Sequence, residues 1–150
     1  MPITISPLHP SEIPAFARLE LEAFRSHPRI PMLWRAGYTA DLYAFYESNK
    51  RDGFADPECR FTKAENDETG RLMAVSEWAF VLDPQKHAER KEPVNPDGMP
   101  PSNWPIGGNW ELRRFFDLNL EKWEKEYLAG RPYISESRSP VAVVCALRLT

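Results

Sequence analysis

One segment, residues 70–82, constrains the fold more than any other part of this 150-residue chain. It is the longest stretch whose composition and alternation are typical of a β-strand. Alternation divides its side chains between two faces, with Leu72, Ala74, Ser76, Trp78, Phe80 and Leu82 on one and Met73, Val75, Glu77, Ala79 and Val81 on the other. Because both faces are mostly apolar, we predict a strand that is covered on both sides by helices.

Shorter segments supply the rest of a sheet. Residues 59–65 form a second predicted strand, and the linker at residues 66–70 reads Asn-Asp-Glu-Thr-Gly, which favours a tight hairpin. Residues 3–5 and residues 131–134 are also predicted strands, and the last of these is interrupted by the polar segment that begins at Ser135. A final apolar run at residues 141–149 is interpreted as one more strand.

Apolar residues at helical spacing predict three helices. The first spans residues 12–26 with Ser11 as its N-cap, and Glu20 is placed with the charged residues on its other faces. The second begins at Thr39 and ends near Lys50. The third begins after Asn109 and carries a broad aromatic stripe.

Two segments lack a regular pattern. Residues 28–34 are predicted to be irregular, and the prolines and glycines of residues 83–108 predict a long loop with a helical turn near residues 87–92. The order of elements predicts an α/β (α+β) fold, with a small mixed or antiparallel sheet and helices on both faces.

Composition narrows the classes of function. The net charge of -3 and the pI of about 5.7 give no reason to expect nucleic acid or an anionic membrane surface as a partner. No apolar run approaches the ~20 residues of a membrane span, and the N-terminus lacks the pattern of a signal peptide. Cys59 and Cys145 can form one disulfide, but two thiols in a reducing cytosol is the favoured interpretation. We therefore predict a cytoplasmic protein.

Glu77 is the candidate catalytic residue. It shares a strand face with Val75 and Ala79, and a carboxylate among apolar groups has a raised pKa and can act as a general base. The alternative is that this face is partly open at Glu77, or that Glu77 pairs with a nearby arginine. Trp78 and Phe80 on the other face are candidates for an acceptor pocket, with a place in the core as the alternative.

Other motifs carry weaker signals. Gly107-Gly108-Asn109 precedes a helix and can hold an anion on its backbone N–H groups, or can be only the turn that starts the helix. No metal-ligand spacing links His9, His27 and His87 to each other or to the cysteines, so no metal site is predicted.

Taken in order, these elements resemble the N-terminal part of the GNAT-type N-acetyltransferases, especially those common in fungi. The resemblance is carried by residues 3–5 with residues 11–24, ending in Ala23-Phe24, by Phe61-Thr62-Lys63-Ala64 with residues 67–78, and by residues 109–134. It covers residues 1–134 as one region, and residues 135–150 form a divergent tail.

The resemblance implies acetyl transfer from acetyl-CoA to a small-molecule or peptide amine. The amine would attack the thioester directly, and Glu77 or a water relay would remove its proton. In that family the fourth strand runs into a Gln/Arg-x-x-Gly-x-Gly/Ala loop that holds the pyrophosphate of acetyl-CoA, and no such motif follows Ile134 here. We therefore expect an incomplete GNAT-like fold that is weakly active or inactive, as in a truncated or alternatively spliced product or an erroneous gene model.

A non-catalytic interaction protein is the alternative function. The edges of an incomplete sheet would then pair with a partner, and the run at residues 141–149 would promote self-association. Binding of coenzyme distinguishes the two functions.

Overall fold

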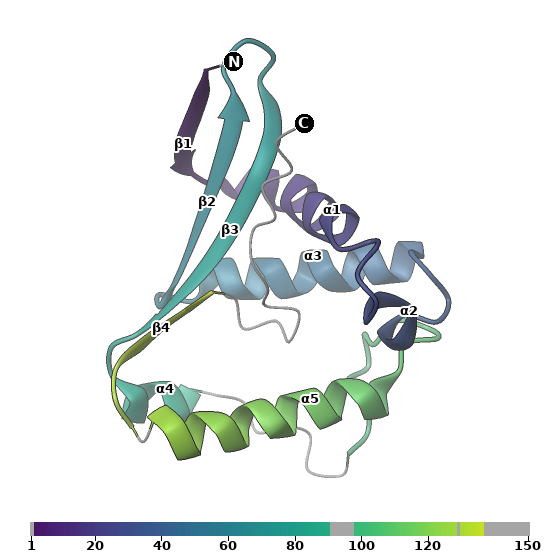
Figure 1. The fold of residues 1–150 in the computed structure, drawn as a ribbon, viewed down its shortest axis with the longest axis vertical. Coiled ribbons are helices and arrows are strands. Elements are labelled where there is room, and N and C mark those ends of the chain that lie inside the picture. Colours follow the sequence, from purple (N-terminus) through teal and green to yellow (C-terminus); the bar gives the residue numbers. More distant parts are fainter. Residues whose placement is uncertain (1, 91–97, 129, 137–150) are drawn as a thin grey trace.

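The computed structural model describes residues 2–90, 98–128 and 130–136, and in these residues the chain has an α+β fold (Figure 1). The helices are η1 (Pro10–Glu12, a 3-10 turn), α1 (Ile13–Ala23), α2 (Ile30–Leu33), α3 (Ala40–Ala55), α4 (Pro84–Arg90), α5 (Trp110–Trp123) and η2 (Glu124–Leu128, a π-helical turn). The strands are β1 (Ile3–Pro7), β2 (Cys59–Asn66), β3 (Arg71–Val81) and β4 (Tyr133–Glu136). The predicted strand at residues 141–149 and the thiol of Cys145 lie outside the described residues.

The four strands form one antiparallel sheet in the order β1-β2-β3-β4. The β2–β3 hairpin closes through the side chain of Asn66, whose Oδ1 accepts hydrogen bonds from Glu68 N at 2.9 Å and Thr69 N at 3.1 Å. Gly70 completes the turn with a positive φ of 63°, a conformation that glycine adopts without steric cost. A register shift beside Ala64 leaves Met73 as an extra residue in β3.

Strand β4 continues two residues further toward the C-terminus than the sequence predicts. Its pairing with β3 runs from Tyr133 opposite Val81 to Glu136 opposite Trp78. The prediction of an interruption at Ser135 is therefore wrong. Hydrogen bonds from a neighbouring strand hold the backbone extended there, and this outweighs the turn preference of serine.

The first helix starts differently from its prediction. His9, not Ser11, is the cap: its ring accepts a hydrogen bond from Ser11 N, and the Glu12 side chain accepts one from His9 N, so the two residues form a capping box around η1. The other predicted caps are confirmed, because Thr39 accepts from Leu42 N at the start of α3 and Asn109 accepts from Leu112 N at the start of α5. The segment at residues 28–34 was predicted to be irregular but contains the short helix α2. The loop at residues 83–108 was predicted to contain one helical turn, and it begins with the short helix α4.

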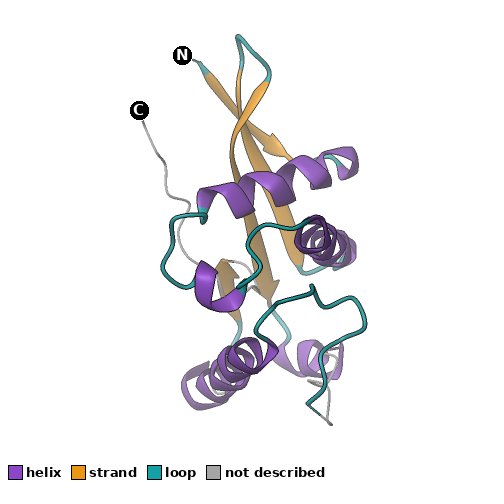
Figure 2. Ribbon diagram, turned by 90° about the vertical axis from the view of Figure 1, so that its right-hand side faces the viewer, coloured by secondary structure: helices purple, strands orange, loops and turns teal. Residues whose placement is uncertain are grey.

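The interior has two apolar clusters. Cluster 1 lies among the helices, and Trp104, Leu112 and Phe116 pack against its buried residues Ala17, Leu21, Ile30, Leu33, Trp34, Leu42, Phe45 and Tyr46. Cluster 2 joins the sheet to α1, with Phe54 of α3 and Val75 packed against its buried residues Leu8, Ile13, Phe16, Cys59, Phe61 and Ala79. Figure 2 shows the helices gathered beside and below the sheet.

The two faces of β3 have different surroundings. Helix α1 packs against β3 and α3 against β2, and the face with Glu77, Ala79 and Val81 is buried beneath them. Among the described residues, the prediction that helices cover both faces is not met on the second face, where Trp78 is 37% exposed and Ile134 of β4 is 58% exposed. Helices α4 and α5 lie beyond the end of the sheet in Figure 1, so they do not act as a second layer.

Helix α5 shows a similar contrast along its length. Leu112 and Phe116 in its first turns pack against cluster 1. Trp123 and Tyr127 continue the same stripe but are 51% and 54% exposed. The aromatic stripe predicted from the sequence is therefore only half used for packing within the described residues. None of the helices in these residues has the length and apolar composition that a bilayer crossing requires.

Candidate functional site

The structure places Glu77 in a buried cluster of three charged side chains. Lys50 of α3 donates from Nζ to Glu77 Oε2 at 2.7 Å and to Glu20 Oε1 at 3.1 Å. Glu20 comes from α1 and Glu77 from β3, so the cluster ties both helices to the sheet. Buried ions need such pairing because removing each from water costs several kcal/mol.

Packing closes this cluster on its remaining sides. Glu77 is 8% exposed, and a Cβ built on Gly53 of α3 would lie 3.0 Å from Glu77 Oε1. The Phe16 ring lies 5.2 Å from Lys50 Nζ. Of the two interpretations of Glu77, pairing with a cation describes its surroundings, although that cation is a lysine instead of an arginine.

The pKa values of Glu20 and Lys50 are shifted for different reasons. Burial raises the pKa of Glu20, against the opposing effect of Lys50. Burial acts to lower the pKa of Lys50, but the charges of Glu20 and Glu77 outweigh it and the pKa is raised. Lys50 therefore remains an ammonium throughout the physiological range.

Sequence analysis missed Lys50 and Glu20 as partners of Glu77. Glu20 was placed on the exposed faces of its helix, and this is wrong, because its side chain is mostly buried. A signal for Lys50 was present: it lies four residues after Tyr46 and four before Phe54, which places a charged residue on the apolar stripe of α3. A charge at such a position indicates a buried partner elsewhere in the chain.

Trp78 and Phe80 lie on the opposite face of β3 from Glu77. Trp78 pairs with Arg60 and Glu136 in the neighbouring strands, and Phe80 pairs with Ile134. The sheet therefore separates the candidate base from the candidate acceptor pocket. A single site cannot be built from these three residues without a path around or through the sheet.

The glycine turn before α5 is packed against protein. A Cβ on Gly108 would lie 2.6 Å from Trp104 Nε1, and one on Gly107 would lie 2.7 Å from Ala36 Cβ. Gly108 N donates to the Pro105 carbonyl, and Asn109 N donates to the Leu33 carbonyl. These N–H groups already have acceptors, so the turn serves to start the helix and does not fit the pyrophosphate of acetyl-CoA.

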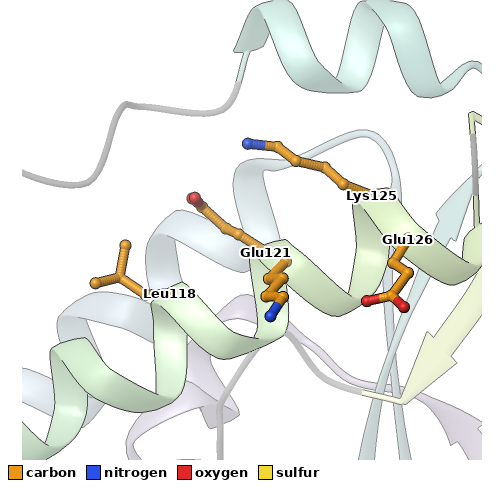
Figure 3. A pocket seen from close by; sticks show the side chains of 5 residues that line it. Leu118, Glu121, Lys125 and Glu126 are labelled. Atoms are coloured by element: carbon orange, nitrogen blue, oxygen red, sulfur yellow. The ribbon is translucent and has the colours of Figure 1, made fainter.

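Two hollows open beside the end of α5. The first lies along one helical stretch, and Figure 3 shows Leu118, Glu121, Lys125 and Glu126 spread over successive turns there. The second, of about 390 Å³, lies between α4, η2 and the start of β4, with His87 and Tyr133 in its lining. Within the described ranges, no group of three or more His, Cys, Asp or Glu side chains is placed to hold a metal ion.

A second group of charged side chains holds α4 near the end of the sheet. His87 Nδ1 lies 2.7 Å from Glu58 Oε2, and Arg90 also pairs with Glu58. Burial acts to raise the pKa of Glu58, but the hydrogen bonds from His87 and Arg90 outweigh it and hold the pKa below its ordinary value. This group orders α4, which the sequence predicted only as a turn.

No protein-family model matches this chain, and no curated protein matches its sequence.

Proposed function

We propose that this chain is a GNAT-like acyltransferase homologue that retains the acceptor side of the fold and has weak or no transfer activity. The order of elements carries the proposal. Strand β1 is followed by α1, the β2–β3 hairpin is followed by α5, and β4 then returns beside β3. This is the series of elements that the resemblance to the family implies for residues 1–134.

The surroundings of Glu77 support low activity. A general base must reach the proton that it abstracts, and Glu77 is buried and bonded to Lys50. The candidate acceptor residues Trp78 and Phe80 lie across the sheet from it. The described residues also offer no fit for the pyrophosphate of acetyl-CoA, the proposed co-substrate, so we derive no transfer step. A cytoplasmic location belongs to the same proposal and rests on the low cysteine content, two cysteines in 150 residues.

Calorimetric titration of the purified, folded chain with acetyl-CoA tests the proposal. We expect no saturable binding, or weak binding that dephospho-CoA matches. Acetylation of a panel of small amines and peptides should then be close to the uncatalysed rate. Tight binding with rapid turnover that survives Glu77→Gln would contradict both the assignment of Glu77 and the low activity.

A non-catalytic interaction protein is the second candidate, and the exposed half of the α5 stripe favours it. Trp123 and Tyr127 present a contiguous aromatic surface, and exposed apolar patches of this kind are frequent at protein interfaces. Strand β4 is the last strand in the order of the described sheet, and strand addition at a sheet edge is a common way of binding a partner.

Sedimentation at several concentrations tests this second function. Self-association should increase with concentration and should be weakened by Trp123→Lys. Lys122→Ala, on the same helical turn but outside the stripe, is the matched control and should leave association unchanged. A monomer at all concentrations would remove self-association from the account.

A further inference from the structure

The Glu20–Lys50–Glu77 cluster contains two acidic side chains but only one basic side chain. Two carboxylates share one ammonium, with Lys50 Nζ 2.9 Å from Glu20 Oε2 and 2.7 Å from Glu77 Oε2. If all three side chains were ionised, the interior would hold one uncompensated negative charge. An isolated buried charge is so costly that the group takes up a proton instead.

No other charged side chain in the described part of the chain lies close enough to balance this negative charge. Tyr46 of α3, the other titratable group close to Glu20, is neutral because burial raises its pKa. Arg113 of α5 faces Tyr46 but is bonded to Asp117, with Nε 2.9 Å from Oδ2. The elements packed around Glu20 therefore supply Lys50 as the cation, Glu77 as a second anion, and no further compensating group among the described residues.

The hydrogen bonds distinguish the two carboxylates. Glu77 Oε2 receives the shorter bond from Lys50. Glu20 accepts through Oε1, while its buried Oε2 receives no hydrogen bond of good geometry from any described residue. A buried carboxylate oxygen without a well-aligned donor is costly, and this cost favours protonation of the Glu20 carboxyl group.

We propose that this cluster is a proton-binding site, with one proton held on the carboxyl group of Glu20 beside the Lys50 ammonium. In this state the cluster is neutral and joins α1 and α3 to the sheet. Loss of the proton at higher pH places a net negative charge between the two apolar clusters and weakens the contact of α1 with β3. The contact of α1 and α3 with the sheet, at the centre of the fold, therefore depends on pH.

The sign of the effect on stability follows from linkage. The pKa of Glu20 is raised in the folded state by burial, so the folded state binds this proton more tightly than the unfolded state does. The stabilisation is complete below the unfolded pKa. It decreases as the pH rises through the folded pKa.

Carbon-13 NMR titration of the glutamate side-chain carboxyls in the full folded chain tests the proposal. The resonance that disappears in Glu20→Gln identifies Glu20. We expect its midpoint above the ordinary glutamate value of about 4.3, with the folded state intact across the titration. A midpoint at or below that value would overturn the proposal.

The substitution Glu77→Gln distinguishes two causes of a raised Glu20 midpoint, the second carboxyl group of the cluster and burial alone. With one carboxylate removed, Lys50 and Glu20 balance each other, so the Glu20 midpoint should fall relative to the unmodified chain. Glu68→Gln, in the exposed hairpin turn, is the matched control and should leave the midpoint unchanged. An unchanged midpoint in Glu77→Gln would also overturn the shared site. Neither result depends on acetyl-CoA, so the outcome is independent of the proposed function.

Discussion

The two faces of β3 carry almost equally apolar sequences but have opposite surroundings. Val81 on one face is 0% exposed, while Trp78 on the other face is 37% exposed. Glu77 is paired and buried on one face, and Trp78 lies partly open on the other. The difference shows that alternation identifies which residues share a face, whereas only the positions of α1 and α3 decide which face becomes the core.

The largest expected effect on stability comes from removing the charge of Lys50, which pairs with Glu77 on the buried face of β3. Lys50→Met should destabilise the protein by about 3–5 kcal/mol at neutral pH, because it leaves two buried carboxylates without a partner. Urea denaturation measures the change. Lys86→Met, at an exposed lysine of α4, is the control and should change stability by less than about 0.5 kcal/mol. Equal effects of the two substitutions would show that the buried cluster adds little to the stability of this face.

Val81, the last residue of β3, and Leu82, the residue directly after the strand, compare a buried with an exposed apolar side chain. Val81→Ala should cost about 2 kcal/mol through lost burial and a residual cavity. Leu82→Ala removes more carbon but should change stability by less than about 0.5 kcal/mol, because its side chain is already exposed to water. Thermal or urea unfolding of both variants measures the two changes in the free energy of unfolding. A large cost for Leu82→Ala would mean that the Leu82 side chain is covered in solution.

Acid should act in opposite directions on the covered cluster and on the charges outside it. Glu58 has a folded pKa held below its ordinary value by His87 and Arg90, so its stabilisation is present above the unfolded pKa and is lost as the pH falls through the folded pKa. Glu58→Gln should cost about 1–2 kcal/mol at neutral pH and progressively less in acid. Glu20→Gln should have the opposite sign: it should change stability little in acid and should stabilise the protein relative to the unmodified chain as the pH rises, because the amide stays uncharged. Denaturation curves at a series of pH values test both, and parallel trends would contradict the contrast.

The smallest expected effect concerns α5, which begins packed and ends exposed. Asn109→Ala removes the side-chain oxygen that accepts from Leu112 N at 3.2 Å, and should cost about 1 kcal/mol. Asn119→Ala, on the exposed part of the same helix, is the control. Hydrogen exchange should show the loss of protection in the first turn of α5 for Asn109→Ala alone. Equal loss in the later turns would mean that the helix unfolds as one unit.

Much of the fold could be predicted because its signals are local. The β2–β3 hairpin depends on Asn66 and Gly70, which bond or bend within the turn itself. The caps Thr39 and Asn109 act on backbone N–H groups three residues away. The bulge at Met73 and the continuation of β4 through Ser135 were not predictable in this way, because each depends on the register with a neighbouring strand.

The candidate site was predicted only in part. The sequence singled out Glu77 as a carboxylate on an apolar strand face, and this face is buried in the structure. Its partners were not identified, because Lys50 lies 27 residues from Glu77 and was assigned to the end of a helix. The roles of Trp78 and Phe80 in an acceptor pocket remain predictions, and their separation from Glu77 by the sheet followed from alternation.

By itself, the sequence determined the α+β class, the hairpin, the caps Thr39 and Asn109 and the sets of residues that share a face. These properties depend on interactions within a few residues, so the local pattern contains the necessary information. The tertiary structure alone decided which face of β3 is covered, how far the α5 stripe is buried, and that Glu20, Lys50 and Glu77 meet. Those outcomes depend on packing between elements distant in the chain, where the burial of apolar surface outweighs local preference.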